Sequence, residues 1–263
     1  MTGRVGDELV NQMDAAAERA GLGARHRMYE GAQPENGSPR SSLVAALVCA
    51  LVAVVLFAAG SAFGLFFVLI AVIAVCLWAA ELSTAAKNTH IRLHLHADGL
   101  VAVAKNRVHA VRYDSTGILQ SSLRHTGAGG YTDHTYKLTD VDGAQVMLQG
   151  REGEAATGRL AGHQEWGRAI QENVTRAQLP KAVASLNSGG RVDFGKLWVT
   201  REEVGSARST AQWNEIEELR VVQGFLKLKV AGKWRSVVHV AVAGIPNFFV
   251  FLTLADQLRR PVR

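Results

Sequence analysis

Cysteine is scarce in this chain, and charge is missing from one long stretch of it. Cys49 and Cys76 are the only cysteines among 263 residues, and both fall within Ser42 to Ala80, where no side chain is charged. This usage excludes a disulfide-stapled secreted fold and a zinc site built from several cysteines. We therefore expect the soluble part of the protein to lie in a reducing, cytosolic compartment.

Sequence motifs of the common enzyme classes are also missing. The chain has no His-Glu-x-x-His, no Gly-x-Ser-x-Gly, no phosphate-cradling Gly-rich loop and no Gly-x-Gly-x-x-Gly. Both thiols lie in the apolar run, where a thiolate is disfavoured. The sequence therefore assigns no catalytic residue, no metal ligand and no cofactor.

The uncharged run is too long for one membrane helix. Leu43 to Ala80 comprises 38 residues, which as one helix would be about 57 Å long against a hydrocarbon core of about 30 Å. Gly60 and Gly64 weaken the helix midway; they also fit a Gly-x-x-x-Gly packing face, but their central position favours a turn. We predict a transmembrane helical hairpin over residues 42–81, with helices at about 43–60 and 64–81.

Basic residues flank this run and are missing from its turn. Arg25, Arg27 and Arg40 precede it, and Lys87 and Arg92 follow it. The positive-inside rule then predicts an integral cell-membrane protein with two spans, whose two termini and C-terminal part are cytoplasmic. A single span plus a re-entrant arm is the alternative, and it would place the C-terminal part outside.

Residues 1–41 are predicted to be a flexible tail that contains at most one short helix. Asp7 to Ala20 has apolar residues at helical spacing, followed by Gly21 and Gly23. Short isolated helices are marginal in water, so this one should form only against a partner or not at all. Gly21 to Ser42 is rich in Gly, Pro, Asn and Ser and is typical of a disordered tether.

Beyond Glu81 the apolar pattern changes to the period-two alternation of half-buried strands. Two hairpins are expected, one from Tyr136 to Leu148 and one from Leu226 to Val242. A helical pattern follows each strand-rich stretch, first over residues 166–177 and then over 248–258. A short similarity at an offset of 100 residues, with Tyr113 matching Trp213 and Leu119 matching Leu219, favours a tandem duplication.

Antiparallel strands closed by one helix are the layout of a pleckstrin-homology-type barrel. The segments that carry a resemblance are His94 to Leu100, Gly190 to Gly195, Trp213 to Ile216 and Ile245 to Asn247. They resemble an uncharacterised actinobacterial membrane-protein family with tandem pleckstrin-homology-like domains, although Tyr113 and Thr116 replace the Trp and Ile of that pattern in the first repeat. The resemblance implies a membrane-anchored α+β fold with two pleckstrin-homology-like units, at residues 88–188 and 189–263, each an antiparallel β-barrel or sandwich closed by a C-terminal helix. It implies a binding or scaffolding fold and no activity.

Three histidines form the one enzymatic hypothesis. His90, His94 and His96 would share a strand face and could hold a metal ion, with a more distant ligand such as His134 or Asp133. Arg92 on the same face would oppose a bound cation. A solvated polar face is the simpler interpretation, so the metal-dependent enzyme is kept as the alternative.

Residues 82–263 carry 24 of the 29 basic side chains and 16 of the 23 acidic ones. Under an anionic leaflet, each well-placed Lys or Arg contributes about 1 kcal/mol of attraction. The residues we would suspect first are Lys227, Lys229, Lys233 and Arg235. No module or stacking platform for nucleic acid accompanies them.

The sequence as a whole predicts a non-enzymatic, membrane-anchored binding or scaffolding protein at the cytoplasmic face. Its partners would be the membrane itself and either anionic lipid headgroups or a protein. No nucleic-acid partner and no cofactor is expected.

Overall fold

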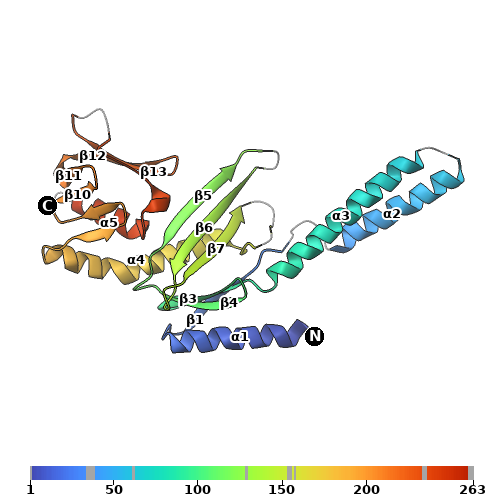
Figure 1. The fold of residues 1–263 in the computed structure, drawn as a ribbon, viewed down its shortest axis with the longest axis horizontal. Coiled ribbons are helices and arrows are strands. Elements are labelled where there is room, and N and C mark those ends of the chain that lie inside the picture. The colour runs from blue at the N-terminus through green and yellow to red at the C-terminus, as the bar shows by residue number, and fades with distance from the viewer. Residues whose placement is uncertain are drawn as a thin grey trace.

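The computed structural model describes residues 2–33, 39–60, 63–127, 130–152, 156, 158–232 and 236–259. The molecule is elongated (Figure 1). Two long helices lie side by side and project from one end, whereas the strands and the other helices form a body that extends to the opposite end. We call α2 (Pro39–Ala58) and α3 (Gly64–Asn88) the helical pair, and all other elements the body.

The described N-terminal segment is part of the body, and the prediction of a disordered tether is wrong for residues 25–30, which form a strand. Helix α1 (Thr2–Arg19) lies against one face of a four-stranded sheet, and β1 (Arg25–Glu30) is the edge strand of that sheet. Met13, Ala16 and Ala17 of α1 pack on Val101 and Val103. The short helix is therefore stabilised by a partner, as predicted, but the partner is this chain's own sheet.

The helical pair is broken where the glycines predicted a break. α2 ends at Ala58 and α3 begins at Gly64. Gly64 lies so close to Phe57 that a Cβ at this position would be 2.8 Å from the ring. Most large apolar side chains of both helices are exposed, and only 6 % of the most apolar window of α3 is buried.

The prediction of a two-span transmembrane hairpin is wrong. Among the described helices, only α3 is long and apolar enough to cross a membrane. The apolar part of α2, Leu43–Ala58, is shorter than the roughly 20 residues that a span needs. Length and composition therefore give one candidate span, and α2 packs beside it.

The helical pair is inserted between two strands that are neighbours in one sheet. β1 precedes the pair and β2 (Arg92–His96) follows it, and the two strands pair antiparallel, with Tyr29 opposite Leu93. The backbone N–H of Gly31 donates to the carbonyl of Ile91 at 2.9 Å. The chain therefore leaves the body and returns to it at the same place.

Asn88, the last residue of α3, fastens the pair to the body. Its side chain is fully buried. The amide nitrogen donates to the carbonyls of Ala32 at 2.7 Å and Ala156 at 3.0 Å, and the amide oxygen accepts from the N–H of Gly158 at 2.8 Å. One amide thus joins the segment before the pair, the end of the pair and the segment that leads to α4.

The first half of the body has two open sheets, and the predicted pleckstrin-homology-like barrel is wrong. The strands form four separate antiparallel sheets in the described chain, none of them closed. In the first half, one sheet has the order β1-β2-β3-β4 and the other β5-β6-β7. The remaining strand bounds are β3 (Gly99–Ala104), β4 (Arg107–Arg112), β5 (Leu119–His125), β6 (Tyr131–Thr139) and β7 (Gln145–Glu152).

The second half repeats the order of four strands, three strands and a helix. Its sheets run β11-β10-β9-β8 and β12-β13-β14, and α5 (Phe248–Arg259) follows them. The bounds are β8 (Val192–Phe194), β9 (Leu197–Val199), β10 (Glu203–Ser206), β11 (Thr210–Gln212), β12 (Ile216–Val222), β13 (Phe225–Val230) and β14 (Val238–Ala241), with short 3-10 turns η1 (Trp213–Glu215) and η2 (Val242–Gly244). Both hairpins and both helices predicted from the pattern are confirmed.

One helix serves the cores of both halves. In α4 (His163–Asn187), Trp166 and Ile170 belong to the first core, whereas Ala182 and Leu186 belong to the second. The predicted domain boundary between residues 188 and 189 stays a prediction. The last turns of α4, which the prediction assigns to the first unit, also pack in the core of the second half.

We expect Asn88→Ala to lower the free energy of unfolding by about 2–3 kcal/mol, because it leaves two carbonyls and one N–H of a part-buried joint without their partner. Thr89→Ala is the matched control, since its hydroxyl only caps an exposed turn at Ala86. Denaturant unfolding of the detergent-solubilised chain measures both. Equal stabilities of the two variants would show that Asn88 does not hold the joint.

Candidate functional site

The structure does not bring the three predicted histidines together in one open site. His90 lies in an exposed turn before β2, because the strand begins only at Arg92. His94 and His96 point to the face that α1 covers, since His94 pairs with Val101 of the cluster beneath α1. The Nδ1 atom of His96 lies 3.0 Å from the carbonyl of Gly23. The metal-enzyme alternative on these residues gains no support.

His94 is a buried, neutral imidazole. It is fully buried, and neither ring nitrogen has a hydrogen-bond partner. Burial lowers the pKa of His94 to about 4, the charges of Arg25, His96 and Arg92 act in the same direction, and Asp14 opposes them. Asp14 lies 3.9 Å from His94 and forms an ion pair with Arg25 at 3.0 Å. The packing between α1 and the sheet therefore favours the neutral form of the His94 ring.

The hairpin that holds the suspected lipid-binding residues carries charges of both signs in its described part. Lys227 and Lys229 lie on β13, and their neighbours across the sheet are Arg220 and Glu218. Lys229 is also 3.9 Å from Glu217. Lys233 and Arg235 lie outside the described residues. The hairpin is at the end of the body opposite the helical pair (Figure 1), so its contact with lipid headgroups stays a prediction that the arrangement does not favour.

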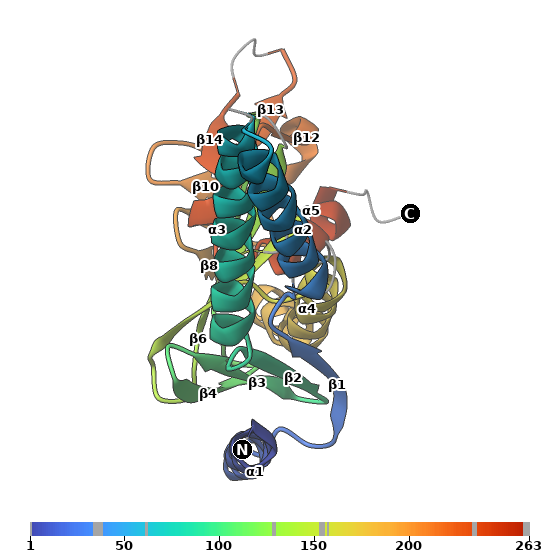
Figure 2. The same cartoon turned by 90° about the vertical axis from the view of Figure 1, so that its right-hand side faces the viewer.

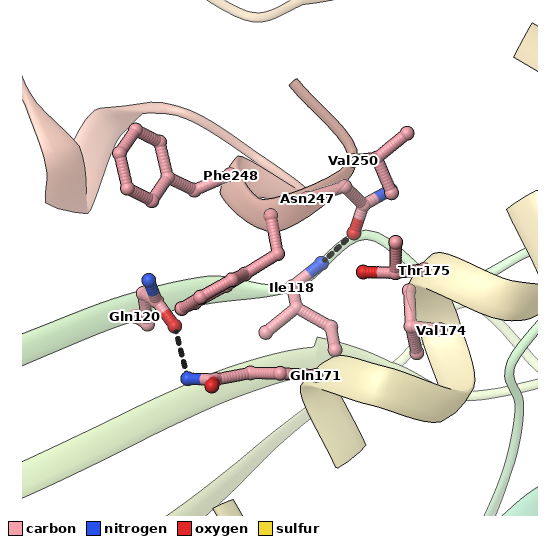
Figure 3. Close-up of a pocket in the computed structure, with 9 residues that line it drawn as sticks. Ile118, Gln120, Gln171, Val174, Thr175, Asn247, Phe248 and Val250 are labelled. Carbon is pink, nitrogen blue, oxygen red and sulfur yellow. Dashed lines mark hydrogen bonds between the residues drawn. The ribbon is translucent and has the colours of Figure 1, made fainter. Parts of the chain in front are cut away.

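A polar joint connects the two halves (Figure 3). Asn247, which precedes α5 and has a φ of 51°, accepts from the N–H of Ile118 at 2.8 Å through its side-chain oxygen. Its amide nitrogen donates to the carbonyl of Thr116 at 3.2 Å and to Gln178 Oε1 at 2.7 Å. The Ile-Pro-Asn segment that carried the family resemblance therefore positions the second half against the first.

Beside this joint lies an open groove of about 400 Å³ between the halves. Gln171 of α4 stands at its wall and donates to Gln120 Oε1 at 2.8 Å and to Tyr136 Oη at 3.0 Å (Figure 3 shows the Gln120 contact). The groove is lined by Gln120, Ser121, Ser122, Tyr136, Gln171, Val221, Gly224, Val242, Ala243 and Phe248. Amide and hydroxyl groups of the first half thus face a mainly apolar wall of the second half across one groove, and ligand sites are common between domains.

A second cluster of ionisable groups lies where α4 begins. The ligand atoms of His134, Glu152 and His163 all lie within 4.8 Å of one another, and these three form the one such group of His, Cys, Asp or Glu that we find in the described part of the chain. His134 is on β6, Glu152 ends β7 and His163 begins α4. The rings of His134 and His163 are stacked, with centroids 4.2 Å apart.

Each side chain of this cluster is positioned by its local environment. Nδ1 of His134 lies 2.9 Å from the hydroxyl of Ser122, its neighbour across the sheet. Burial lowers the pKa of His163, nearby His134 lowers it further, and Glu152 raises it. The His163 ring is therefore neutral near pH 7, which is the form that binds metals.

Gly150 creates the space in which the two rings meet. It lies opposite His134 in the β6–β7 ladder. A Cβ at this position would lie 2.3 Å from the Cβ of His163 and 3.0 Å from the ring of Trp166. Only glycine lets the first turn of α4 approach the sheet this closely.

Sequence reasoning named His134 only as a distant ligand and missed Glu152 and His163. The available signal was the alternation of His134, Tyr136 and Leu138, which places His134 on the core-facing side of its strand. Nothing in the spacing shows that α4 starts against that face, so the partners could not be found.

We expect α1 to detach as the pH falls from about 6.5 to 4. The docked His94 stays neutral while the undocked ring takes up a proton, so the stabilisation is complete above pH 6.5 and is lost toward pH 4, by about 1–3 kcal/mol. Hydrogen exchange of the α1 amides between pH 7 and pH 4.5 measures this. His94→Leu should flatten the profile and the exposed His26→Leu should not; an unchanged profile in His94→Leu would rule out this ring as the cause.

A comparison with curated proteins found no match. A protein-family model, by contrast, matches residues 10–263. The matched range takes in most of α1, the helical pair, both halves of the body and every residue of the groove and of the histidine cluster. The prediction that the chain comes from an uncharacterised family is confirmed at that level. The chain belongs to a family of unknown function, DUF6585.

Proposed function

We propose that the protein is a non-enzymatic binding or scaffolding module that the helical pair anchors to the cell membrane, with the body at the cytoplasmic face. The pairing of β1 with β2 carries this proposal. These strands flank the helical pair in sequence and are neighbours in one sheet. The chain therefore leaves the body and returns to it at one place, and the anchor, with α3 as its one candidate span, has a single base there.

The surface of the helical pair supports a lipid environment. The pair projects from the body (Figure 1) with its two helices side by side (Figure 2), and most of its large apolar side chains are exposed. An apolar surface of this size is costly in water, and monomeric soluble proteins rarely expose one. Its helical backbone satisfies its own polar groups, as a membrane segment must.

The charges at the base of the pair favour the cytoplasmic side. Lys87 lies in the last turn of α3 and Arg92 begins β2, so both are at the base of the pair, where basic residues mark the cytoplasmic side of membrane proteins. Arg25 and Arg27 also precede the pair in sequence, but they lie toward the other end of β1, where Arg25 is opposite His96.

The shape of the body supports binding to a partner away from the bilayer. The second half lies at the far end of the molecule from the helical pair (Figure 1), and the open groove lies between the halves. Asn247 and α4 hold the halves together, so the groove is preformed. A rigid two-part surface held at a distance from the membrane suits the recruitment of a cytosolic molecule.

We expect the full chain to stay in the membrane fraction after alkaline carbonate extraction. Replacing residues 34–86 by a short Gly/Ser linker should give a soluble, cooperatively folding body, because Ala32 and Asn88 are already in hydrogen-bond contact. Fractionation and thermal unfolding measure the two properties. A full chain that carbonate releases, or a linker variant that still sediments with membranes, would contradict the anchor.

We expect a membrane-impermeant maleimide to label Arg208→Cys, an exposed position in the second half, only after the cells are permeabilised. The background is Cys49→Ser with Cys76→Ser, so that no other thiol reacts. Arg25→Cys, before the helical pair, should behave in the same way because both positions lie on one side. Labelling of either cysteine in intact cells would refute the cytoplasmic placement.

A further inference from the structure

We infer that His134, Glu152 and His163 form a binding site for a divalent transition metal ion of the zinc class, held between the β5–β7 sheet and the first turn of α4. The site is separate from the anchor, and Ser122, which contacts His134, also lines the groove. It joins three segments that are separate in sequence: the middle of β6, the end of β7 and the start of α4.

The spacing of the ligand atoms fits one ion after small movements. All of them lie within 4.8 Å of one another, and Nε2 of His134 is 3.9 Å from a carboxylate oxygen of Glu152. Zinc bonds of about 2.0–2.1 Å in a tetrahedral site place ligand atoms about 3.3 Å apart. The side chain of Glu152 is 57 % exposed, so it is free to make most of this adjustment.

The unpaired ring nitrogen of His134 supports a bound metal ion. Its Nε2 atom is buried and has no hydrogen-bond partner. Buried polar atoms in proteins are nearly always satisfied, and a cation held between this nitrogen, the carboxylate and the second imidazole would satisfy it. Ser122, 2.9 Å from Nδ1, can accept the proton of that nitrogen and leave the lone pair on Nε2, which is how second-shell groups orient metal-binding histidines.

The donor set selects the class of metal. Two imidazoles and one carboxylate suit zinc and its neighbours, whereas Mg²⁺ and Ca²⁺ prefer oxygen ligands throughout. Three protein ligands leave a fourth position for water or for a donor from a bound partner. The exposed side of Glu152 gives the ion a path from solvent.

A bound ion would fasten α4 to the sheet at the point where Gly150 lets the two approach. Because α4 is shared by both cores, the ion would also steady the arrangement of the halves.

The test uses the full chain in detergent, stripped with EDTA and titrated with ZnCl₂ by calorimetry, and with Co²⁺ by absorption spectroscopy. We expect about one equivalent of zinc per chain and the visible bands of four-coordinate Co²⁺. His134→Gln, Glu152→Gln and His163→Gln should each weaken binding by more than about tenfold, and Ser122→Ala by about tenfold. His26→Gln, an exposed histidine outside the cluster, should bind as the unaltered chain does.

Two results would overturn the inference. One is unchanged zinc affinity in the three ligand variants, which would place any zinc elsewhere; the other is no binding at millimolar zinc, which would leave the two rings as a stacked pair only. Thermal unfolding of each variant separates lost binding from lost folding. If a histidine variant fails to fold, the zinc affinity of Glu152→Gln serves as the test by itself. The side chain of Glu152 is exposed, so its replacement should leave the fold intact.

Discussion

The arrangement of the whole molecule depends on the antiparallel pairing of β1 with β2. These strands are separated in sequence by the helical pair, yet they lie side by side, and Asn88 locks their junction with three hydrogen bonds. The pair is therefore an insertion into an edge of one sheet. Because β1 and β2 belong to one sheet, the segments before and after the pair stay together in the body.

Helix α4 is the second organising element. Its first turns complete the core of the first half and its last turns complete the core of the second. Asn247 then ties the start of α5 to Ile118 and Gln178. With two such connections the halves are held as one body, and the groove between them is a fixed feature. The histidine cluster lies at the other end of the same helix, where α4 meets the β5–β7 sheet.

Much of the local structure follows from the sequence pattern. Period-two alternation located the strands around Tyr136 and Leu228, apolar spacing located α4 and α5, and Gly60 and Gly64 located the break between α2 and α3. The errors about the strands share one cause, which is that pairing partners are not encoded locally. Residues 25–30 look like a polar tether because β1 is an exposed edge strand, and the strands were expected to close into barrels although they form four open sheets.

The sequence by itself determined that this chain has a long uncharged apolar segment that contains both of its cysteines, and two strand-rich halves, because these are properties of composition and periodicity. Only the tertiary structure decided that the segment leaves and re-enters one sheet, that His94 is buried beneath α1, and that His134, Glu152 and His163 meet. Those contacts join residues far apart along the chain, and the close approach at Gly150 and the hydrogen bonds of Asn88 exist only once the sheets and helices have packed.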